Sequence, residues 1–398
     1  MKYQFANNIP ESNEDPVGNI LKVAGDPKII SFAGGLPAPE LFPVEDLKKV
    51  TNEVYDESGR EALQYSIAAG YPKLREEIAK RMNRSGIACD IDNIMITTGS
   101  QQSIDLTTKL FVNPGDTVIV EQPTYLCALD VFRSYGAHMV GVPMDNDGMK
   151  MDALEQAIRD NPNTKFIYTI PSFQNPTGRT MPADRRQKMI EIAEKYNVMI
   201  LEDDPYGAIR FAGQDVAPVK TYAHDDRVIY MSTFSKILAP GLRIGWIVAE
   251  KNLVKKFTLM KQTVDVHSDN LTQHIIAKYM SDYNIDDHIA KIKDVYRRRE
   301  GIMMDAIKKY FPTDAKYSQP EGGLFIWVEV PGVDTQTLFN TCIDHDVAFV
   351  PGEPFYADKV IPGTFRLNYS NMQDDQIVTG IERLGKAIKE TISKQVEV

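Results

Sequence analysis

Short apolar runs alternate with amphipathic stretches along most of this chain. The apolar runs, which polar turns bound, predict strands at residues 94–96, 117–121, 137–142, 166–170, 198–201, 228–231 and 244–248. Helical periodicity between most of them predicts helices at 73–84, 104–111, 152–159 and 183–196. Strands that are apolar on both faces and separated by helices are typical of a mostly parallel sheet covered by helices on both sides. We therefore expect an α/β fold.

The last quarter of the chain has a different pattern. A long helical stretch at 286–310 precedes a strand at 323–330, a helix at 335–344, a strand near Phe349 and a helix at 374–393. This order indicates a smaller α+β unit. Because 398 residues exceed what one core usually serves, we expect more than one domain. We predict an N-terminal segment (1–45) that joins the small domain, a large domain (46–290) and a small C-terminal domain (291–398).

Composition and charge narrow the classes of partner. With 43% hydrophobic and 25% charged residues, the composition is that of an ordinary globular protein. The net charge of −10 argues against a nucleic-acid partner, because phosphate backbones are bound by dense Lys and Arg. The only basic cluster, 297–299, lies in an acid-rich helical pattern, and we interpret it as a solvated helix face. No apolar run approaches the ~20 residues of a membrane span, so we expect no membrane partner.

Cysteine usage indicates the compartment. The three cysteines, Cys89, Cys127 and Cys342, are far apart in the sequence and form no CxxC pair. This fits a reducing cytoplasm and no structural zinc. The first residues lack the apolar segment of a signal peptide. We expect a cytoplasmic protein.

One lysine lies among residues suited to a phosphorylated cofactor. Lys236 is flanked by Thr233, Ser235 and Arg243. A lysine amine forms a Schiff base with an aldehyde, and a phosphate on that aldehyde needs hydroxyl and guanidinium donors nearby. Taken alone, the dipeptide at 235–236 is common, and a solvated lysine in a loop is then the preferred explanation.

Glycine-containing turns offer close backbone approach. Gly34 and Gly35 form a tight polar turn, and Gly99, Ser100 and Gln101 connect a predicted strand to a predicted helix. Backbone N–H groups at such a helix start make an anion site. An ordinary N-cap serine at Ser100 is the alternative.

Further polar residues follow predicted strands, where ligands of open α/β sheets bind. Tyr125 and Asn175 lie in turns after two of them, and either residue also has an ordinary structural explanation. Asp203 lies between two other carboxylates after a buried strand, so a cation or a metal must compensate them. Yet the six histidines are scattered, and none has ligand spacing to these acids. Arg366, in an apolar strand, needs either an internal acid or a ligand carboxylate.

In their order and spacing these motifs resemble the fold type I pyridoxal-5′-phosphate aminotransferases of class I/II. Within them the resemblance is to the branch of 2-aminoadipate, kynurenine and aromatic amino acid aminotransferases, and it runs over nearly the whole chain. The matching motifs are GGLP at 34–37, TGSQQ at 98–102, NPTG at 175–178, EDDPY at 202–206, SK at 235–236 with Arg243, and FRL at 365–367.

The resemblance implies that the large domain binds pyridoxal 5′-phosphate. Lys236 then binds its aldehyde and moves a proton as base and acid, while Asp203 keeps the pyridine nitrogen protonated. Tyr206 and Asn175 hydrogen-bond the ring oxygen, and Tyr125 stacks on the ring. The residues that hold the phosphate are Gly99, Ser100, Gln101, Thr233, Ser235, Arg243 and, from the other subunit of a homodimer with the site at its interface, Tyr65. The residues that bind the substrate are Gly35, Asn175 and Arg366, of which Arg366 binds the carboxylate.

The implied activity is transfer of the amino group of an L-amino acid to a 2-oxo acid, with 2-oxoglutarate as the acceptor. Relatives that favour acidic side chains often carry an arginine in a Pro-Ile-Arg segment near the N-terminus. Gly18 occupies that place here, within residues 15–20. We therefore expect aromatic or large apolar amino acids to be favoured, with 2-aminoadipate still possible.

Two alternatives use the same scaffold. One is a C–S β-lyase, which the motifs do not separate from an aminotransferase. The other is a non-catalytic regulator, since this fold is fused to winged-helix DNA-binding domains in some bacterial transcription factors. The roughly thirty residues before Gly34 are too few for such a domain, and the acidic charge also argues against it.

Overall fold

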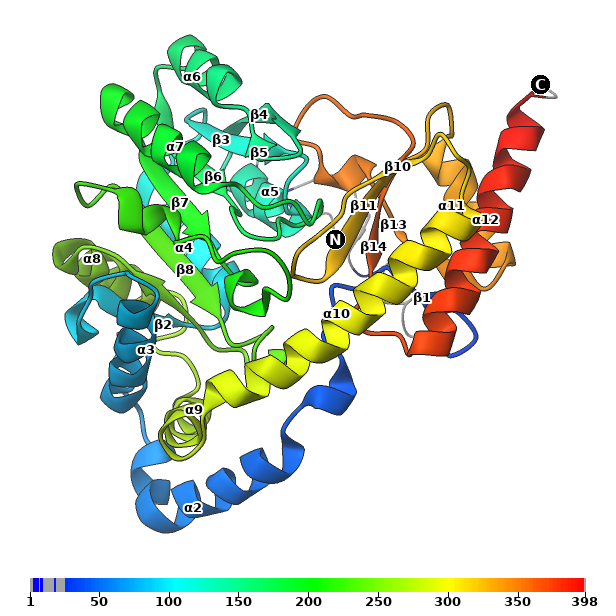
Figure 1. Ribbon diagram of the computed structural model, residues 1–398. Helices are drawn as coiled ribbons and strands as arrows, with labels where there is room; N and C mark the ends of the chain where they lie inside the picture. The colour runs from blue at the N-terminus through cyan, green and yellow to red at the C-terminus, as the bar shows by residue number, and fades with distance from the viewer. Residues whose placement is uncertain (1–2, 7, 10–17, 19–25, 397–398) are drawn as a thin grey trace.

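The computed structural model describes residues 3–6, 8–9, 18 and 26–396. Its largest element is an eight-stranded sheet with helices on both faces (Figure 1). In spatial order the strands are β2 (Ile94–Thr97), β9 (Gly245–Val248), β8 (Val228–Thr233), β7 (Met199–Asp203), β6 (Thr164–Thr169), β3 (Thr117–Gln122), β4 (His138–Asp145) and β5 (Gly148–Met149). The predicted α/β fold is confirmed.

Strand direction decides where the carboxyl ends meet. Strands β4, β3, β6, β7 and β8 run parallel to one another. Strand β9 is antiparallel to both of its neighbours, and β5 is antiparallel to β4. The parallel strands β3, β6, β7 and β8 therefore end along one edge of the sheet, where open α/β sheets bind ligands.

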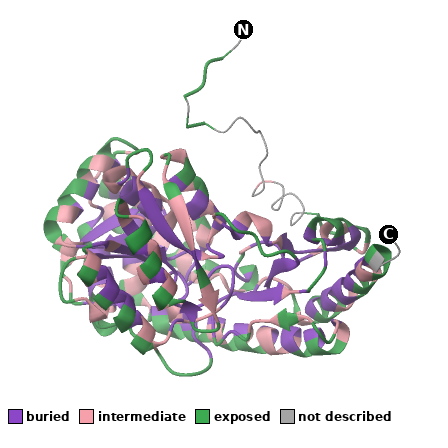
Figure 2. Cartoon of the chain, turned by 90° about the horizontal axis from the view of Figure 1, so that it is seen from above, coloured by how far each residue is buried: buried purple, intermediate pink, exposed green. Residues whose placement is uncertain are grey.

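Helices cover the sheet because it is apolar on both faces. Every residue of β2, β8 and β9 is buried, and Figure 2 shows buried strands inside helices whose outer faces are exposed. The helices up to the second unit are α2 (Val44–Ala62), α3 (Pro72–Arg84), α4 (Ser100–Phe111), α5 (Leu126–Ser134), α6 (Met151–Asp160), α7 (Ala183–Tyr196), α8 (Lys251–Gln262) and α9 (Asn270–Asp282). Short 3₁₀ turns lie at Pro39–Leu41, Ile91–Asn93, Gly207–Ile209, Val219–Tyr222, Pro240–Leu242 and Glu353–Phe355.

The long helix α10 (Ile285–Tyr310) leads to a second, smaller sheet (Figure 1). Its strands, in spatial order, are β10 (Lys316–Tyr317), β11 (Phe325–Glu329), β14 (Thr364–Asn368) and β13 (Val350–Pro351), and its helices are α11 (Thr335–Asp344) and α12 (Asp374–Val396). Strand β1 (Ile30–Ser31) pairs in parallel with β12 (Val347–Ala348), which ties residues 30 and 31 to this unit. The domain boundaries at 45 and 290 stay predictions.

The prediction of a solvated arginine run is wrong for Arg299. This side chain is 1% exposed and donates to Ser370 O at 2.6 Å and to Gln373 Oε1 at 3.0 Å. It also forms an ion pair with Glu40. The guanidinium therefore joins α10 to two distant segments, which explains how a charge is buried there. No helix in the described ranges is long and apolar enough to cross a membrane.

Candidate active site

A cavity of about 260 Å³ lies between the carboxyl edge of the large sheet and the strands β11 and β14. Of the predicted site residues, all line this cavity except Gly99 and Tyr65. The lining is Ala33, Gly34, Gly35, Leu36, Ser100, Gln101, Tyr125, Leu126, Cys127, Ile170, Asn175, Asp203, Pro205, Tyr206, Thr233, Ser235, Lys236, Pro240, Arg243, Phe325 and Arg366. Motifs that are more than 300 residues apart in the sequence thus meet around one space.

Lys236 lies just past the end of β8, and its amine is held inside the cavity. The Nζ atom donates to Gly35 O at 2.8 Å, so the early glycine turn anchors it. Burial, helped by the charges of Arg366 and Arg243, lowers the pKa of Lys236 to about 8. A larger share of the amine is therefore neutral near pH 7 than in a solvated lysine, which suits a nucleophile and proton acceptor.

Asp203 ends β7 with one satisfied and one free carboxylate oxygen. Its Oδ2 atom accepts from Tyr168 OH at 2.8 Å, whereas the buried Oδ1 atom has no hydrogen-bond partner. Burial, together with the nearby charges of Asp204 and Glu121, raises the pKa of Asp203 to about 7. A buried acceptor without a donor is rare in a protein, and a ligand N–H in the cavity would satisfy it.

The neighbouring acids, Glu202 and Asp204, accept hydrogen bonds from groups outside the cavity. Glu202 accepts from the backbone N–H of Val219 at 2.7 Å and of Lys220 at 2.9 Å. Asp204 accepts from Tyr230 OH at 3.0 Å and from Gly207 N at 2.9 Å. Of these acids only Asp203 lines the cavity. In the part of the chain that the structure describes, no three His, Cys, Asp or Glu residues form a group that could hold a metal.

The start of α4 forms one wall of an anion site. Gly99 is the N-cap, with φ of +77°, and Ser100 is the first helical residue, so Ser100 is not the N-cap that the alternative required. A Cβ atom on Gly99 would lie 2.5 Å from Arg243 Nη2. Only glycine at position 99 lets the guanidinium approach the N-terminus of the helix this closely.

Hydroxyl groups complete the anion site after β8. Ser235 Oγ lies 2.9 Å from Thr233 Oγ1 and 3.4 Å from Arg243 Nη1. Arg243 also donates to Pro240 O at 3.3 Å, and no carboxylate among the described residues pairs with it. A helix start, two hydroxyls and an unneutralised guanidinium together favour a phosphate.

Arg366 resolves the choice between an internal acid and a ligand. It is 6% exposed and donates to Asn175 Oδ1 at 2.7 Å and to Ala33 O at 2.8 Å. Its guanidinium carbon lies 4.3 Å above the ring of Phe325, and no described acid pairs with it. Burial lowers the pKa of Arg366 to about 10. A buried cation bound only to neutral oxygens can still bind a ligand carboxylate.

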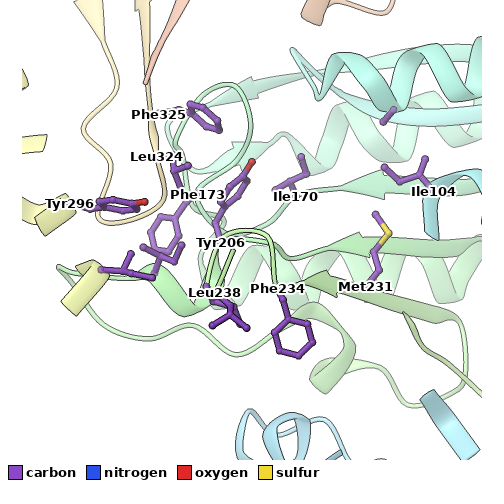
Figure 3. Close-up of a cluster of buried hydrophobic side chains, with 14 of the residues drawn as sticks. Ile104, Ile170, Phe173, Tyr206, Met231, Phe234, Leu238, Tyr296, Leu324 and Phe325 are labelled. Atoms are coloured by element: carbon purple, nitrogen blue, oxygen red, sulfur yellow. The ribbon is translucent and has the colours of Figure 1, made fainter. Parts of the chain in front are cut away.

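Two tyrosines define the remaining walls. Tyr125 directly precedes α5, and its OH donates to Gln101 Oε1 at 3.3 Å. The Tyr206 ring meets the Phe325 ring edge-on at 5.8 Å, and burial raises the pKa of Tyr206. Figure 3 labels Tyr206, Phe325 and Ile170 as members of one cluster of buried side chains. The cavity therefore offers flat apolar surfaces beside its polar groups.

Two sequence predictions are not tested by the lining of this cavity. Tyr65 is 83% exposed, and its ring contacts His267 at a centroid distance of 5.8 Å. Its predicted contact with the other subunit stays a prediction. Of the segment 15–20 only Gly18 is among the described residues, so the expectation about side-chain preference that rests on this segment also stays a prediction.

The model of the family described as "Aminotransferase class I and II" matches residues 28–384. The chain belongs to the class I and II aminotransferases. It is 42% identical to aromatic-amino-acid aminotransferase 1 of Thermococcus litoralis over 95% of this chain and 92% of that protein. It is 36% identical to 2-aminoadipate transaminase of Thermus thermophilus over 94% of this chain and 93% of that protein.

A solved structure also matches this aminotransferase closely. The kynurenine aminotransferase of Pyrococcus horikoshii, in complex with PMP and with kynurenine as substrate, superposes with a TM-score of 0.93 at 40% identity. The match covers 97% of each chain. The fold type I assignment is therefore confirmed.

Sequence reasoning missed residues that complete the aminotransferase site. Tyr168, whose hydroxyl bonds Asp203, reads as one more apolar position of a buried strand. Phe325 lies in the smaller sheet and is not part of any of the sequence motifs. Glu121 accepts from Thr169 Oγ1 at 2.6 Å and from Gln174 Nε2 at 3.0 Å. An acid in an otherwise apolar strand was a signal that could have revealed this last residue.

Proposed function

We propose that this aminotransferase uses pyridoxal 5′-phosphate to transfer the amino group of an L-amino acid to a 2-oxo acid, with 2-oxoglutarate as the acceptor. One observation carries the proposal. The Lys236 amine, the free Oδ1 atom of Asp203 and the acid-free Arg366 face one cavity beside an anion site. PMP in the structure of the Pyrococcus relative supports the same cofactor here.

The residues present fit this cofactor. The free Oδ1 of Asp203 matches a protonated pyridine nitrogen, and the anion site at Gly99 and Arg243 matches the phosphate. The other groups proposed to hold the cofactor are Ser100, Gln101, Tyr125, Asn175, Tyr206, Thr233 and Ser235. When bound, pyridoxal phosphate withdraws electrons from the substrate Cα and so makes its proton acidic.

Four side chains of the protein would move the proton and orient the substrate and the cofactor ring. Lys236 Nζ, with its lowered pKa, accepts the Cα proton and later returns a proton. Arg366 binds the α-carboxylate and fixes which bond at Cα faces the base. Tyr206 and Asn175 lie within reach of each other near Arg366 and orient the ring oxygen.

The carboxylate assignment predicts a defect of Arg366→Lys in KM. Lysine keeps one positive charge but loses the planar fork, so we expect KM for amino acid and 2-oxo acid to rise about tenfold or more. Steady-state kinetics with each substrate varied in turn measure it. Arg298→Lys, on the exposed side of α10, is the matched control and should change neither KM. Unchanged KM values in Arg366→Lys would reject the assignment.

The cavity lining favours amino donors whose side chain carries no carboxylate. Its charged lining side chains are Asp203, Lys236, Arg243 and Arg366, and each already has a proposed partner. Apolar lining comes from Leu36, Leu126, Ile170 and Phe325. The distal carboxylate of a donor such as 2-aminoadipate, like that of the acceptor 2-oxoglutarate, thus finds no further cation among the described residues that line the cavity, whereas an aromatic or large apolar donor side chain finds apolar contacts. We propose this preference, with 2-aminoadipate as the lesser candidate.

A panel of the twenty amino acids and 2-aminoadipate, each with 2-oxoglutarate, tests the function and the preference. We expect kcat/KM for phenylalanine to exceed that for 2-aminoadipate by about tenfold, or ~1.4 kcal/mol in transition-state binding. Quantified oxo-acid products give both values. Pyruvate formed from L-cysteine conjugates without an acceptor would instead favour the β-lyase, and faster turnover of 2-aminoadipate would reverse the preference. The absence of both reactions would leave the regulatory alternative.

We also propose a cytoplasmic homodimer with the site at its interface. Support comes from exposed apolar side chains on two segments that meet where the Tyr65 ring contacts His267, namely Leu63, Tyr65, Ile67, Val264 and Val266. Tyr65 then reaches the phosphate of the other subunit. The unpaired cysteines Cys89, Cys127 and Cys342 fit a reducing compartment. Sedimentation equilibrium of the holoenzyme tests the dimer, and a fully active monomer would reject it.

A further inference from the structure

Behind the anion site lies a fully buried lysine. The side chain of Lys261, near the C-terminal end of α8, is 0% exposed. Its Nζ atom donates to both oxygens of Asp265, at 2.9 and 2.8 Å, and to Gln102 Oε1 at 2.7 Å and Ser268 Oγ at 2.9 Å. Every one of its N–H donors therefore has an acceptor.

The partner carboxylate remains ionised. Although burial opposes it, hydrogen bonds from Lys261 and Gln102 lower the pKa of Asp265 overall. Gln102 donates to Asp265 Oδ2 at 2.7 Å, so its amide bridges the two charged groups. Lys261, Asp265 and Gln102 thus form one closed set of charge-assisted hydrogen bonds.

This set holds Thr98 by both of its polar groups. The backbone N–H of Thr98 donates to Gln102 Oε1 at 2.8 Å, and its hydroxyl donates to Asp265 Oδ2 at 3.2 Å. The same hydroxyl lies 2.9 Å from Ser268 Oγ. Thr98 directly precedes Gly99, so the network fixes the backbone immediately before the helix start.

None of the four network residues lines the cavity. Thr98, Gln102, Lys261 and Asp265 are absent from the cavity lining, whereas Ser100 and Gln101 line it. The Lys261 side chain is fully buried, whereas that of Asp265 is 27% exposed. Burying the lysine charge costs desolvation, and an apolar group of the same volume often gives equal or greater stability. Fold stability alone therefore gives little reason for ionised groups at this point. A need to hold the backbone before the helix start in one position explains these ionised groups better.

We infer that Lys261 and Asp265 are positioning residues for the phosphate of the cofactor. Through Gln102 and Thr98 they hold Gly99 in its positive φ and keep the N-terminus of α4 against Arg243. Backbone N–H groups at a helix start bind an anion well only when they are fixed in place. The inference rests on the proposed function, because it takes the anion to be the cofactor's phosphate.

Comparing cofactors with and without phosphate tests the inference. Pyridoxal has the aldehyde and the ring of pyridoxal phosphate but lacks the anion. In Lys261→Met, which keeps the side-chain length without the charge, the Kd of pyridoxal phosphate should rise about tenfold or more, while the Kd of pyridoxal changes less than twofold. Spectroscopic titration of the cofactor-free protein gives both values. Lys256→Met, an exposed position of the same helix, should change neither.

An equal change in both Kd values, or none in either, would overturn the inference. If Lys261→Met does not accumulate as folded protein, Asp265→Asn replaces it, because it keeps an acceptor oxygen and removes only the charge. The same ratio of the two Kd values decides. Failure of the proposed function is seen separately, because the unmodified protein would then bind neither cofactor and transaminate nothing.

Discussion

Lys236→Ala is expected to lose transamination by about four orders of magnitude or more, because it removes both the amine that binds the cofactor aldehyde and the group that moves the Cα proton. Lys236 is the lysine in the cavity lining, so among the described residues no second amine takes over the proton. Single-turnover absorbance changes with phenylalanine measure the rate. Borohydride reduction followed by peptide mass analysis should find no pyridoxyl group at position 236.

The matched control is Lys256→Ala, an exposed lysine of α8 that lies outside the cavity. It should keep the wild-type rate and cofactor content. Circular dichroism confirms that both variants are folded. Turnover of Lys236→Ala within tenfold of the wild type would contradict the assignment of this lysine, whatever its cofactor content.

Much of the fold follows from local sequence. The helices at 183–196 and 335–344 have the predicted bounds, because each has a clear start. Pro182 precedes the first, and Asp334 caps the second by accepting from Thr337 N at 2.8 Å. Strand direction is different, since the sequence of β9 does not show that it runs against both neighbours. The two-residue strand β1 is too short to have any period.

The candidate site was predictable where residues follow strands. Asp203 is the last residue of β7 and Lys236 follows β8, and these parallel strands end at the same edge, so proximity in space follows from topology. Tyr168 and Phe325 were not predictable in this way, because their roles depend on contacts with residues distant in the sequence. Arg299 shows the same limit, since its acid partner Glu40 is 259 residues away. Sequence reasoning locates chemical groups well and their long-range partners poorly.

The buried carboxyl group of Asp203 has a raised pKa, and this is the basis of a second prediction. Its pKa is raised because the carboxylate is buried near Asp204 and Glu121, so its negative charge costs stability in the cofactor-free protein. A ligand N–H that donates to the free Oδ1 atom would offset the cost of burying this charge. A residue that is unfavourable for the empty fold and fits a protonated ring nitrogen is typical of a functional site.

Asp203→Asn is therefore expected to lower the rate without releasing the cofactor. The amide still accepts the hydrogen bond from Tyr168 but cannot hold a proton on the ring nitrogen, so kcat should fall about a thousandfold while the cofactor stays bound. Single-turnover experiments measure the rate, and the cofactor absorbance measures how much cofactor stays bound. Tyr168→Phe, which removes the bond to Oδ2 and keeps the carboxylate, is the control and should lose far less rate. An unchanged kcat in Asp203→Asn would mean that another group protonates the ring.

The pH dependence of unfolding checks the electrostatic part of that prediction. An Asp whose folded pKa is raised from 3.8 to about 7 binds more protons in the native state than in the unfolded state between those values. Its contribution to stability therefore declines as the pH rises through this window and is constant above it. The cofactor-free Asp203→Asn variant lacks this loss. Its Tm should match the wild type near pH 4 and exceed it increasingly up to pH 7, and a Tm difference independent of pH would contradict the raised pKa.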